Sequence, residues 1–460
     1  MDPEICYRAV LARDARFDGL FFTAVRTTRI FCRPVCPART PYRHNVEFFS
    51  NAAAAQAAGY RPCLRCRPEV SPDTPAWAGT SATVQRALRL IDEGALDAQT
   101  TADLAARLGL TDRHLRRLFL EHVGVPPVAV AQTRRTLFAK NLISETSLPF
   151  SEIAFAAGFA SLRRFNESIR KMYGRNPREL RRFSPPEAAD SAIELELHYR
   201  PPYDWEAFLA FVRPRAIPGL EEVSADRYQR AGIVVRNDPS RHCLTARIEP
   251  ANARSLRRIA EQIRFFFDLR ANLHQIAGQL GRDRLLKETV KRRPGLRLPG
   301  CWDAFELAVR AMLGQQVTVK GATTLAGRLV ERFGAITPAI LAEADVAAIG
   351  LPKARAESIR AFARAMCDGQ IRFDASVSSS EMIGRMCELP GIGPWTANYI
   401  AMRALGDPDA FPASDLGLLK AADVSSPRRL EEMAERWRPW RAYAAMYLWE
   451  SLREPLRQKG

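Results

Sequence analysis

The sequence predicts a multidomain protein that is mainly α-helical, with α+β parts. At 460 residues the chain is too long for one ordinary domain. Four grouped cysteines near the N-terminus indicate a small metal-held domain, and two similar helix-turn-helix patterns indicate a helical domain after it. A stretch of alternating apolar and polar residues then precedes a long helical region, which predicts an α+β subdomain followed by an all-helical core.

The charge of the chain predicts a polyanionic partner. The formal net charge is +17, the pI is near 9.9, and basic residues are spread along the whole length. Nucleic acid is the favoured partner, and an anionic membrane surface is the alternative. No apolar run approaches the ~18 residues of a membrane-spanning helix, and the N-terminal stretch MDPEICYRAV lacks a signal-peptide core. We therefore expect a cytoplasmic protein with no membrane partner.

The cysteine pattern predicts a zinc site. Cys32 and Cys36 are separated by three residues, and Cys63 and Cys66 by two. Four thiolates paired in this way can bind zinc tetrahedrally, whereas nine cysteines scattered through a long chain do not fit a secreted disulfide framework. Disulfides and unrelated free thiols are the alternatives. On spacing alone, the zinc would only hold a small domain together.

The residues around these cysteines carry a more specific signal. The stretches FDGLFFTAVRTTRIFCRPVCPAR and AAGYRPCLRCRP closely resemble the N-terminal domain of the Ada DNA-methylation sensor, over roughly residues 2–70. The resemblance implies that Cys32 accepts a methyl group from a methylated DNA phosphate, while the other three cysteines stay permanent ligands. Zinc keeps a bound thiol deprotonated, and the thiolate is the nucleophile.

The same resemblance places Thr28, Arg39 and Arg61 near the methylated phosphate, although each arginine taken alone is an ordinary solvated charge. Zinc with four thiolates carries a charge of about −2, and converting one thiolate to a thioether leaves about −1. We therefore hypothesise that methylation of Cys32 tightens DNA binding electrostatically. A purely structural zinc module is the alternative.

Two helix-turn-helix motifs in tandem are predicted after a linker over residues 71–80. Residues 101–124 and 151–174 each contain a short apolar helix, a glycine turn and an arginine-rich second helix, and residues 128–147 form a connecting helix. The layout resembles the DNA-binding domain of AraC-type transcription activators over roughly residues 82–182. The resemblance implies promoter DNA and RNA polymerase as partners.

The second helix of each motif carries the candidate DNA contacts. Arginine suits guanine edges and asparagine suits adenine edges, although a phosphate contact is the commoner role for any one of these residues. The candidates are Arg113, His114, Arg116, Arg117, Arg163, Arg164 and Asn166.

The C-terminal half begins after a second predicted linker, residues 183–191. Strand-like patterns predict a small antiparallel sheet with accompanying helices within residues 193–270. Beyond Arg297 the pattern is helical, and residues 431–452 are predicted to form the last long helix. The predicted strands are residues 193–200, 231–237 and 242–250.

A glycine hairpin and one aspartate stand out in the helical region. In the sequence LPGIGP, Gly391 and Gly393 permit a tight turn and close backbone approach, and Pro394 suits the first position of a helix. That helix presents free N–H groups to an anion such as phosphate. Asp415 follows in a turn that opens another helix. Taken alone, the hairpin indicates nonspecific DNA binding and Asp415 a helix N-cap.

This half closely resembles the AlkA 3-methyladenine DNA glycosylases of the helix-hairpin-helix superfamily, from about residue 193 almost to the end. The matching stretches are RPGLRLPGCWDAFELAVRAMLGQQVTV, LPGIGPWTANYIAMRA and ERWRPWRAYAAMYLW. The resemblance implies that Asp415 stays ionised and stabilises an oxocarbenium-like sugar. It also implies that Trp395, Tyr399 and Trp449 line the pocket for a flipped base, with core packing as the alternative.

Several features refine this expectation. Strand-cleaving relatives place a lysine at the position of Trp395, so its absence predicts a monofunctional enzyme. Gln316 stands where an apolar wedge is usual, and Ser414 where a second acidic residue can occur. The carbonyls of Leu389 and Ile392 are candidate ligands of a monovalent cation that bridges to phosphate. No Pro-Cys-His-Arg stretch occurs, so O6-alkylguanine repair is not expected.

The sequence thus predicts an alkylation-damage protein with four parts. Its DNA substrates would be methylphosphotriesters, read by the zinc module, and alkylated purines, which the glycosylase excises by monofunctional hydrolysis. A transcription regulator whose glycosylase-like half is a passive DNA clamp is the alternative, favoured by Gln316. The predicted parts are residues 1–75 (zinc methyl acceptor), 76–184 (tandem helix-turn-helix), 193–295 (antiparallel-sheet subdomain) and 296–460 (helix-hairpin-helix glycosylase).

Overall fold

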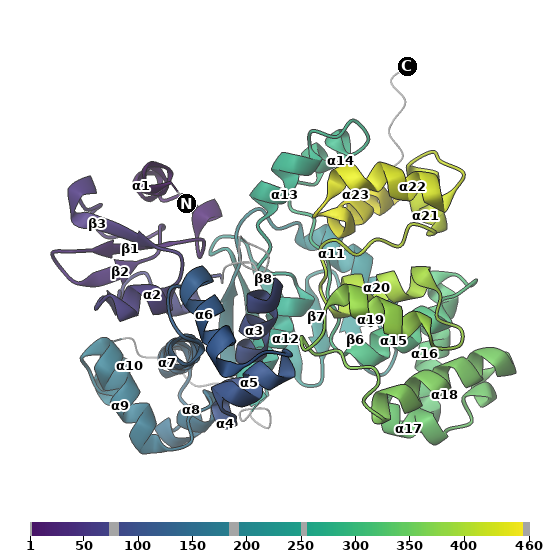
Figure 1. Cartoon of the computed structure of the whole chain (residues 1–460), viewed down its shortest axis with the longest axis horizontal. Coiled ribbons are helices and arrows are strands. Elements are labelled where there is room, and N and C mark those ends of the chain that lie inside the picture. The colour runs from purple at the N-terminus through teal and green to yellow at the C-terminus, as the bar shows by residue number, and fades with distance from the viewer. Residues whose placement is uncertain (1, 73–81, 184–192, 250–254, 454–460) are drawn as a thin grey trace. The chain divides into compact units, whose positions relative to one another are not determined.

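The computed structural model describes residues 2–72, 82–183, 193–249 and 255–453 (Figure 1). The predicted linkers at residues 71–80 and 183–191 lie almost wholly outside these ranges. The chain divides into two compact units, and each is described by itself. Unit 1 consists of residues 1–201, 232–264 and 269–271, and unit 2 of residues 202–231, 265–268 and 272–460.

The N-terminal module of unit 1 is a small sheet flanked by helices. Its elements are α1 (Pro3–Ala12), β1 (Phe22–Val25), β2 (Ile30–Cys32), β3 (Val46–Phe49), α2 (Ala52–Ala57) and β4 (Arg61–Pro62). The strand order is β3-β1-β2-β4, with β2 parallel to β4 and the other pairs antiparallel. Phe22, Phe31 and Tyr60 are buried in its core. These strands are too short to show alternation, so none of them was predicted from the sequence.

The helical module of unit 1 confirms the two predicted helix-turn-helix motifs. Its elements are α3 (Ala82–Asp92), α4 (Ala95–Ala98), α5 (Thr101–Arg107), α6 (Asp112–His122), α7 (Pro127–Glu145), α8 (Phe150–Ala156), α9 (Leu162–Tyr173) and α10 (Pro177–Phe183). Thr111 and Ser161 cap the second helix of each motif by accepting a backbone N–H. Gly158 has a φ of +86° in the turn between α8 and α9, a conformation that favours glycine.

Helix α7 is the predicted connecting helix, and it lies against α2, α3, α8, α9 and α10 (Figure 1). Its buried Lys140 ammonium lies 3.2 Å from the Glu69 carboxylate, which belongs to the N-terminal module. Arg67 donates to Asn141 over 2.9 Å and to Glu145 over 2.5 Å. Buried charges therefore tie the cysteine-rich loop to the helix that joins the two motifs.

Unit 1 also contains three antiparallel strands, β5 (Ile193–His198), β8 (Ile233–Asp238) and β9 (Cys243–Ile248). They confirm the three predicted strands. Strand β9 pairs with β5 through Ile193↔Ile248 and with β8 through Val235↔Ala246. Leu195 and Leu197 are buried while Glu194 is exposed, as expected of a strand with one face in the core.

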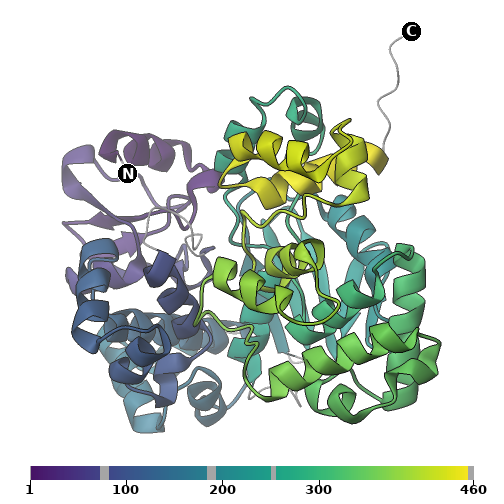
Figure 2. The ribbon, with the colours of Figure 1, turned by 45° about the vertical axis from the view of Figure 1, so that its right-hand side comes forward.

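Unit 2 is mainly helical and carries one strand pair, β6 (Glu221–Val223) with β7 (Arg227–Arg230). Helix α12 (Leu256–Phe266) supplies residues to both units. The other helices are α11 (Trp205–Val212), α13 (Leu273–Leu280), α14 (Lys287–Arg292), α15 (Ala304–Leu313), α16 (Val319–Phe333), α17 (Pro338–Glu343), α18 (Lys353–Cys367), α19 (Ser379–Cys387), α20 (Pro394–Ala404), α21 (Leu416–Ala421), α22 (Pro427–Ala434) and α23 (Arg441–Arg453). They run from teal through green to yellow in Figures 1 and 2.

The last helical stretch corrects one prediction. Residues 431–452 were expected to form a single helix, but α22 ends at Ala434 and α23 begins at Arg441. Pro439 lies in the gap, where it has no N–H to donate and its ring would clash with the preceding turn of a helix. The two shorter helices replace the long one, and the predicted fold class is otherwise confirmed.

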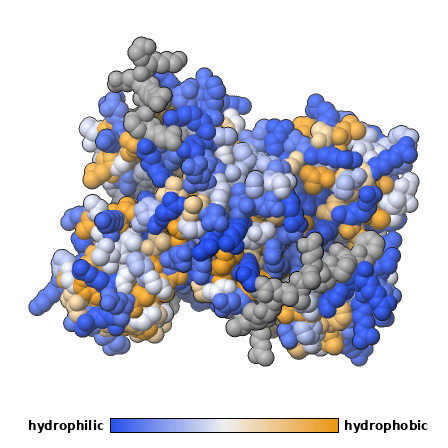
Figure 3. All heavy atoms as spheres, turned by 180° about the vertical axis from the view of Figure 1, so that it is seen from behind, coloured by the Kyte–Doolittle hydropathy of each residue, from blue (hydrophilic) through white to orange (hydrophobic). Residues whose placement is uncertain are grey.

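The surface agrees with the high charge of the chain. Hydrophilic residues cover most of the described surface on the face shown in Figure 3. None of the described helices is long and apolar enough to cross a membrane.

Removing one partner of the buried Lys140–Glu69 pair is predicted to destabilise unit 1. In Lys140→Met the Glu69 carboxylate keeps only Arg67, at 3.5 Å, and we expect a loss of about 3 kcal/mol in the free energy of unfolding. Lys140→Met combined with Glu69→Gln should recover much of that loss. Arg428→Ala at the exposed Arg428–Glu432 pair is the control and should change stability little. Thermal unfolding of the full chain measures all three; equal melting temperatures for wild type and Lys140→Met would contradict the prediction.

Candidate functional site

The four grouped cysteines meet in one cluster in unit 1. Cys32 ends β2, Cys63 directly follows β4, and the Sγ atoms of all four lie within 4.8 Å of one another. Cys63 and Cys66 are buried, whereas Cys32 and Cys36 are half-buried. Four sulfur ligands this close fit the tetrahedral coordination that zinc prefers.

Arg33 fixes the loop of Cys66. Its backbone N–H donates to the Cys66 sulfur over 3.3 Å, and its guanidinium donates to the Cys66 carbonyl over 3.2 Å. The same guanidinium pairs with buried Asp18, which also accepts a hydrogen bond from Ser71 over 3.1 Å. Such outer contacts orient metal ligands, and sequence reasoning missed them because Arg33 and Asp18 are fifteen residues apart.

The predicted phosphate contacts surround the cysteines. Thr28, Arg39 and Arg61 are exposed and line the same cavity as Cys32 and Cys36. Two more basic residues that the sequence reasoning did not single out, Arg65 and Arg175, line it as well. A positive rim around the half-buried thiols suits an approaching phosphate.

The predicted helix-turn-helix contacts lie elsewhere on unit 1. Arg113, Arg116 and Arg117 are exposed on α6, and Arg163 and Arg164 are exposed on α9. His114 on α6 and Asn166 on α9 are half-buried. Arg116 pairs with Asp112 over 2.9 Å and Arg163 with Glu167 over 3.0 Å, both within their own helix. These side chains do not line the cavity of the cysteines, so the two sets form separate surfaces.

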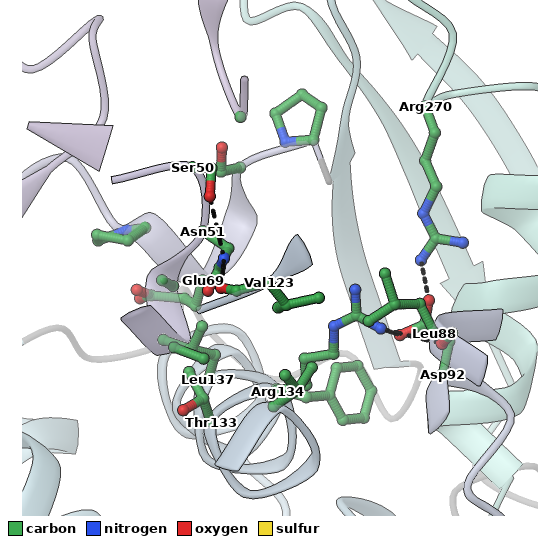
Figure 4. Close-up of a pocket in the computed structure, with 18 of the residues that line it drawn as sticks. Ser50, Asn51, Glu69, Leu88, Asp92, Val123, Thr133, Arg134, Leu137 and Arg270 are labelled. Carbon is green, nitrogen blue, oxygen red and sulfur yellow. Dashed lines mark hydrogen bonds and ion pairs between the residues drawn. The ribbon is translucent and has the colours of Figure 1, made fainter. Parts of the chain in front are cut away.

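A further cavity of about 240 Å³ lies within unit 1 (Figure 4). Its charged groups are paired with each other: Arg134 donates to the Leu88 carbonyl over 3.1 Å and pairs with Asp92, which also lies 3.5 Å from Arg270. Asn51 donates to the Val123 carbonyl over 2.9 Å. These pairs join neighbouring segments of the unit, and none of the predicted site residues lines this cavity.

In unit 2, the Asp415 carboxylate lies where three helices meet. Its Oδ2 accepts a hydrogen bond from the Trp395 indole on α20 over 3.0 Å, and its Oδ1 accepts one from the Trp449 indole on α23 over 2.9 Å. Oδ1 also accepts the backbone N–H of Leu418 over 3.0 Å, which makes Asp415 the N-cap of α21. The structure thus shows the helix cap, which the sequence offered as the alternative to a catalytic role, and the same carboxylate also contacts the two indoles.

The three predicted aromatic residues are brought together beside this carboxylate. Trp395 and Tyr399 stack with ring centroids 5.5 Å apart and planes 10° apart, and Trp449 meets Tyr399 edge-on at 6.4 Å. Phe211, which sequence reasoning missed, lies 6.4 Å from Trp449. All three predicted side chains stay partly accessible.

The hairpin joins α19 to α20 as predicted. Gly391 has a φ of +76°, and a Cβ there would lie 2.3 Å from the Ser358 hydroxyl, so glycine is required. Gly393 has an ordinary backbone conformation and open space around it, which lets another molecule approach its backbone. Pro394 is the first residue of α20.

The loop between α15 and α16 approaches this hairpin. Gln315 donates from its side chain to the Gly391 carbonyl over 2.8 Å and to the Thr396 hydroxyl over 2.9 Å. The next residue, Gln316, is exposed and has a φ of +59°, a strained conformation for a residue with a side chain. Gln315 thus holds the hairpin, and the turned backbone presents the Gln316 side chain outward. Ser414 is exposed beside Asp415.

Sequence models of four families match the chain. They are the metal binding domain of Ada at residues 5–69, a helix-turn-helix domain at residues 104–182, the AlkA N-terminal domain at residues 194–303 and the HhH-GPD superfamily base excision DNA repair protein at residues 309–440.

A probable bifunctional transcriptional activator/DNA repair enzyme AlkA of Mycobacterium tuberculosis is 43% identical over 488 residues, covering 99% of this chain and 98% of that protein. The chain belongs to this bifunctional Ada/AlkA family. Two shorter matches fit the family. DNA-3-methyladenine glycosylase 2 of Escherichia coli is 35% identical over 55% of this chain and 95% of that enzyme, and the Ada enzyme of the same organism is 43% identical over 28% of this chain and 35% of that protein.

Membership of the Ada/AlkA family confirms the predicted resemblances. The partner of the chain is therefore DNA. Its function lies in DNA alkylation repair by a glycosylase and in transcription activation. The Ada metal-binding domain and its four-cysteine cluster support zinc as the bound metal.

The cluster is predicted to hold one zinc ion per chain. Cys63→Ser should lose most of that zinc and lower the melting temperature, because metal binding contributes to the folding of a small module. Cys367→Ser is the matched control, since Cys367 is exposed and lies on α18, and it should keep full zinc content. Elemental analysis of the purified proteins measures the ratio; undiminished zinc in Cys63→Ser would exclude this site.

Proposed function

We propose that the chain accepts a methyl group from DNA methylphosphotriesters on Cys32, activates transcription, and excises alkylated purines of the 3-methyladenine type by monofunctional hydrolysis. The observation that carries the excision is the Asp415 carboxylate held by the indoles of Trp395 and Trp449. This carboxylate lies beside the aromatic side chains of Trp395, Tyr399 and Trp449. A carboxylate there suits the stabilisation of positive charge on a sugar.

The excision follows from the charges of its participants. An N3-alkylated adenine already carries a positive charge, so it leaves with the electron pair of the C1′–N bond and needs no strong general acid. The outer face of the stacked Trp395–Tyr399 pair would attract such a cation in the flipped-out position. Asp415 then faces the cationic sugar until water adds to C1′. Since residue 395 is tryptophan and not lysine, no Schiff base forms and the strand stays uncut.

The hairpin and the Gln316 loop complete this proposed site. Free N–H groups at the start of α20 and the open backbone at Gly393 support binding of a DNA phosphate, and carbonyls of Leu389 and Ile392 are candidate ligands of a monovalent cation there. The outward-facing Gln316 side chain would fill the gap left by the flipped base and hydrogen-bond to the unpaired partner base.

The methyl transfer is a displacement at carbon. Zinc, when bound, keeps the Cys32 thiol deprotonated. The Cys32 sulfur attacks the methyl carbon, the carbon–oxygen bond breaks, and its electron pair remains on the phosphate as a diester. Arg39 and Arg61 at the cavity rim support binding of that phosphate. The cluster loses one negative charge, which reduces its repulsion of DNA.

Transcription activation is assigned to the helix-turn-helix module with RNA polymerase as a partner. The exposed arginines of α6 and α9 are its proposed promoter contacts. We assign methyl acceptance to residues 1–75, transcription activation to residues 76–184 and excision to residues 296–460, with residues 193–295 as the antiparallel-sheet subdomain. The alternative, a passive DNA clamp in place of a glycosylase, is favoured only by Gln316 at the wedge position.

Asp415→Asn is predicted to lower the rate of 3-methyladenine release from alkylated DNA by about 100-fold or more, because the charge facing the sugar is lost while the N-cap to Leu418 can remain. Asp423→Asn, at the exposed end of α21 where φ is +52°, is the matched control and should keep the wild-type rate. Chromatography of the released bases measures both. A wild-type rate in Asp415→Asn would remove Asp415 from the mechanism, and no release by wild type would favour the passive clamp.

Methylation of Cys32 is predicted to raise affinity for DNA. The methylated cluster carries one negative charge less and repels the DNA phosphates less, and salt screens this repulsion, so the effect should be largest at low salt. Protein incubated with DNA carrying methylphosphotriesters should gain one methyl group on Cys32 by mass spectrometry. Cys32→Ala should gain none there. Affinities of methylated and unmethylated protein are then compared across a salt series; identical affinities at every salt concentration would refute the electrostatic switch.

A further inference from the structure

Three arginines gather beside Tyr399 in unit 2. Arg403 is buried, and it donates from Nη1 to the Tyr399 oxygen over 2.9 Å. Arg215 lies over the Phe211 ring, 3.9 Å from its centroid, and Arg403 lies 5.2 Å from the same centroid. Arg310 on α15 lines one cavity with Arg215 and Arg403, and its buried Nε has no hydrogen-bond partner among the described residues.

These guanidiniums have no carboxylate of their own. Within the described ranges, no Asp or Glu oxygen lies within 4.0 Å of a nitrogen of Arg215, Arg310 or Arg403. The nearest acidic residues are engaged: Glu306 pairs with Arg230 over 2.7 Å, and Glu221 accepts from the Tyr228 hydroxyl over 2.6 Å. Arg403 instead donates to backbone carbonyls of Pro299 and Gly300, over 2.6 and 2.8 Å.

Three unpaired positive charges are the opposite of what a pocket for a cationic base requires. Each would repel an N3-alkylated purine stacked on Trp395 and Tyr399. The Tyr399 oxygen accepts a hydrogen bond from Arg403, and none of the described groups is recorded as accepting its own O–H. A phenol in this position gives up its proton at little cost.

We propose that Tyr399 ionises more readily than an ordinary tyrosine, to a phenolate held by Arg215, Arg310 and Arg403, and that this phenolate makes the pocket prefer cationic alkylated purines to neutral bases. The preference rests on the proposed glycosylase activity, whereas the charge on Tyr399 does not. The phenolate offsets the arginines and makes the ring beneath the base a stronger partner for a cation.

The surroundings of Tyr399 support this charge. Burial alone would raise the pKa of Tyr399, but the positive charges of Arg403, Arg215 and Arg310 lower it to about 8. These groups come from α20, the segment after α11, and α15. Acidic neighbours that line the same cavity as the arginines are Glu221, Asp303 and Glu306, and Arg453 adds positive charge near Arg215. Since the folded pKa lies below the ordinary value near 10, the charge grows as pH rises through 8 and is lost as pH falls below it.

Ultraviolet titration of the full chain without DNA tests the charge. Wild type should show a phenolate transition centred near pH 8 that is missing from Tyr399→Phe. Tyr42→Phe, which removes an exposed phenol, should lose absorbance change only at more alkaline pH. Arg310→Met should move the early transition to higher pH, because it removes one guanidinium with few other bonds. Identical early transitions in wild type and Tyr399→Phe would refute the proposal.

Single-turnover excision tests the preference. The rate ratio of cationic 3-methyladenine to neutral hypoxanthine should rise in wild type from about pH 6.5 to about pH 8.5, and in Tyr399→Phe it should be roughly fivefold lower and independent of pH. A phenolate without excision of either base would overturn both the preference and the glycosylase activity. Excision with a ratio independent of pH in wild type would overturn the preference alone.

Discussion

The Asp415 carboxylate is the constraint on which the geometry of unit 2 depends. It accepts hydrogen bonds from two indoles and one backbone N–H, so α20, α21 and α23 are fixed to a single group. The same bonds orient the Trp395 and Trp449 rings. The carboxylate and these two rings therefore cannot move independently, and the proposed stabilisation of a cationic sugar requires such preorganisation.

Unit 1 uses charge in a different way. Arg33 contacts the buried Cys66 and pairs with Asp18, and Arg67, the next residue after Cys66, is bound to α7. Lys140 adds a second buried pair to Glu69 in the same region. The cysteine cluster and the helix between the two helix-turn-helix motifs are thus joined by charges that are costly to separate, in contrast to the exposed pairs on α6 and α9.

Much of both sites could be predicted from the sequence, because the spacing of residues within the motifs determines which side chains come together. The two cysteine pairs, the hairpin from Leu389 to Pro394 and the offset to Asp415 each identify a local geometry, and the structure brings the cysteines together and Asp415 to the predicted aromatics. The strands of the N-terminal module could not be predicted, since two to four residues show no period. The helical periodicity over residues 431–452 predicted one continuous helix. Pro439, which disfavours a helix interior, was the feature of the sequence that could have predicted the break.

The residues that sequence reasoning missed are those whose role depends on distant partners. Arg215, Arg310 and Arg403 are separated by about ninety residues each and look like ordinary surface charges in a basic chain, yet they converge on Tyr399. In the sequence, neither Arg33 nor Asp18 shows any sign of the ion pair that the two residues form in the structure. In both units the motifs locate the reactive groups, and buried arginines from elsewhere in the chain set the charge around them.

The central claim is that one chain carries two independent chemistries, methyl acceptance at Cys32 and base excision at Asp415. Its most direct test uses the full chain with DNA that contains both methylphosphotriesters and 3-methyladenine, followed by mass analysis of the protein and chromatography of the released bases. The account predicts that Cys32→Ala releases 3-methyladenine at the wild-type rate without gaining the methyl group, and that Asp415→Asn gains the methyl group without releasing the base. Loss of base release in Cys32→Ala, or loss of both products in Asp415→Asn with zinc content and melting temperature unchanged, would contradict it.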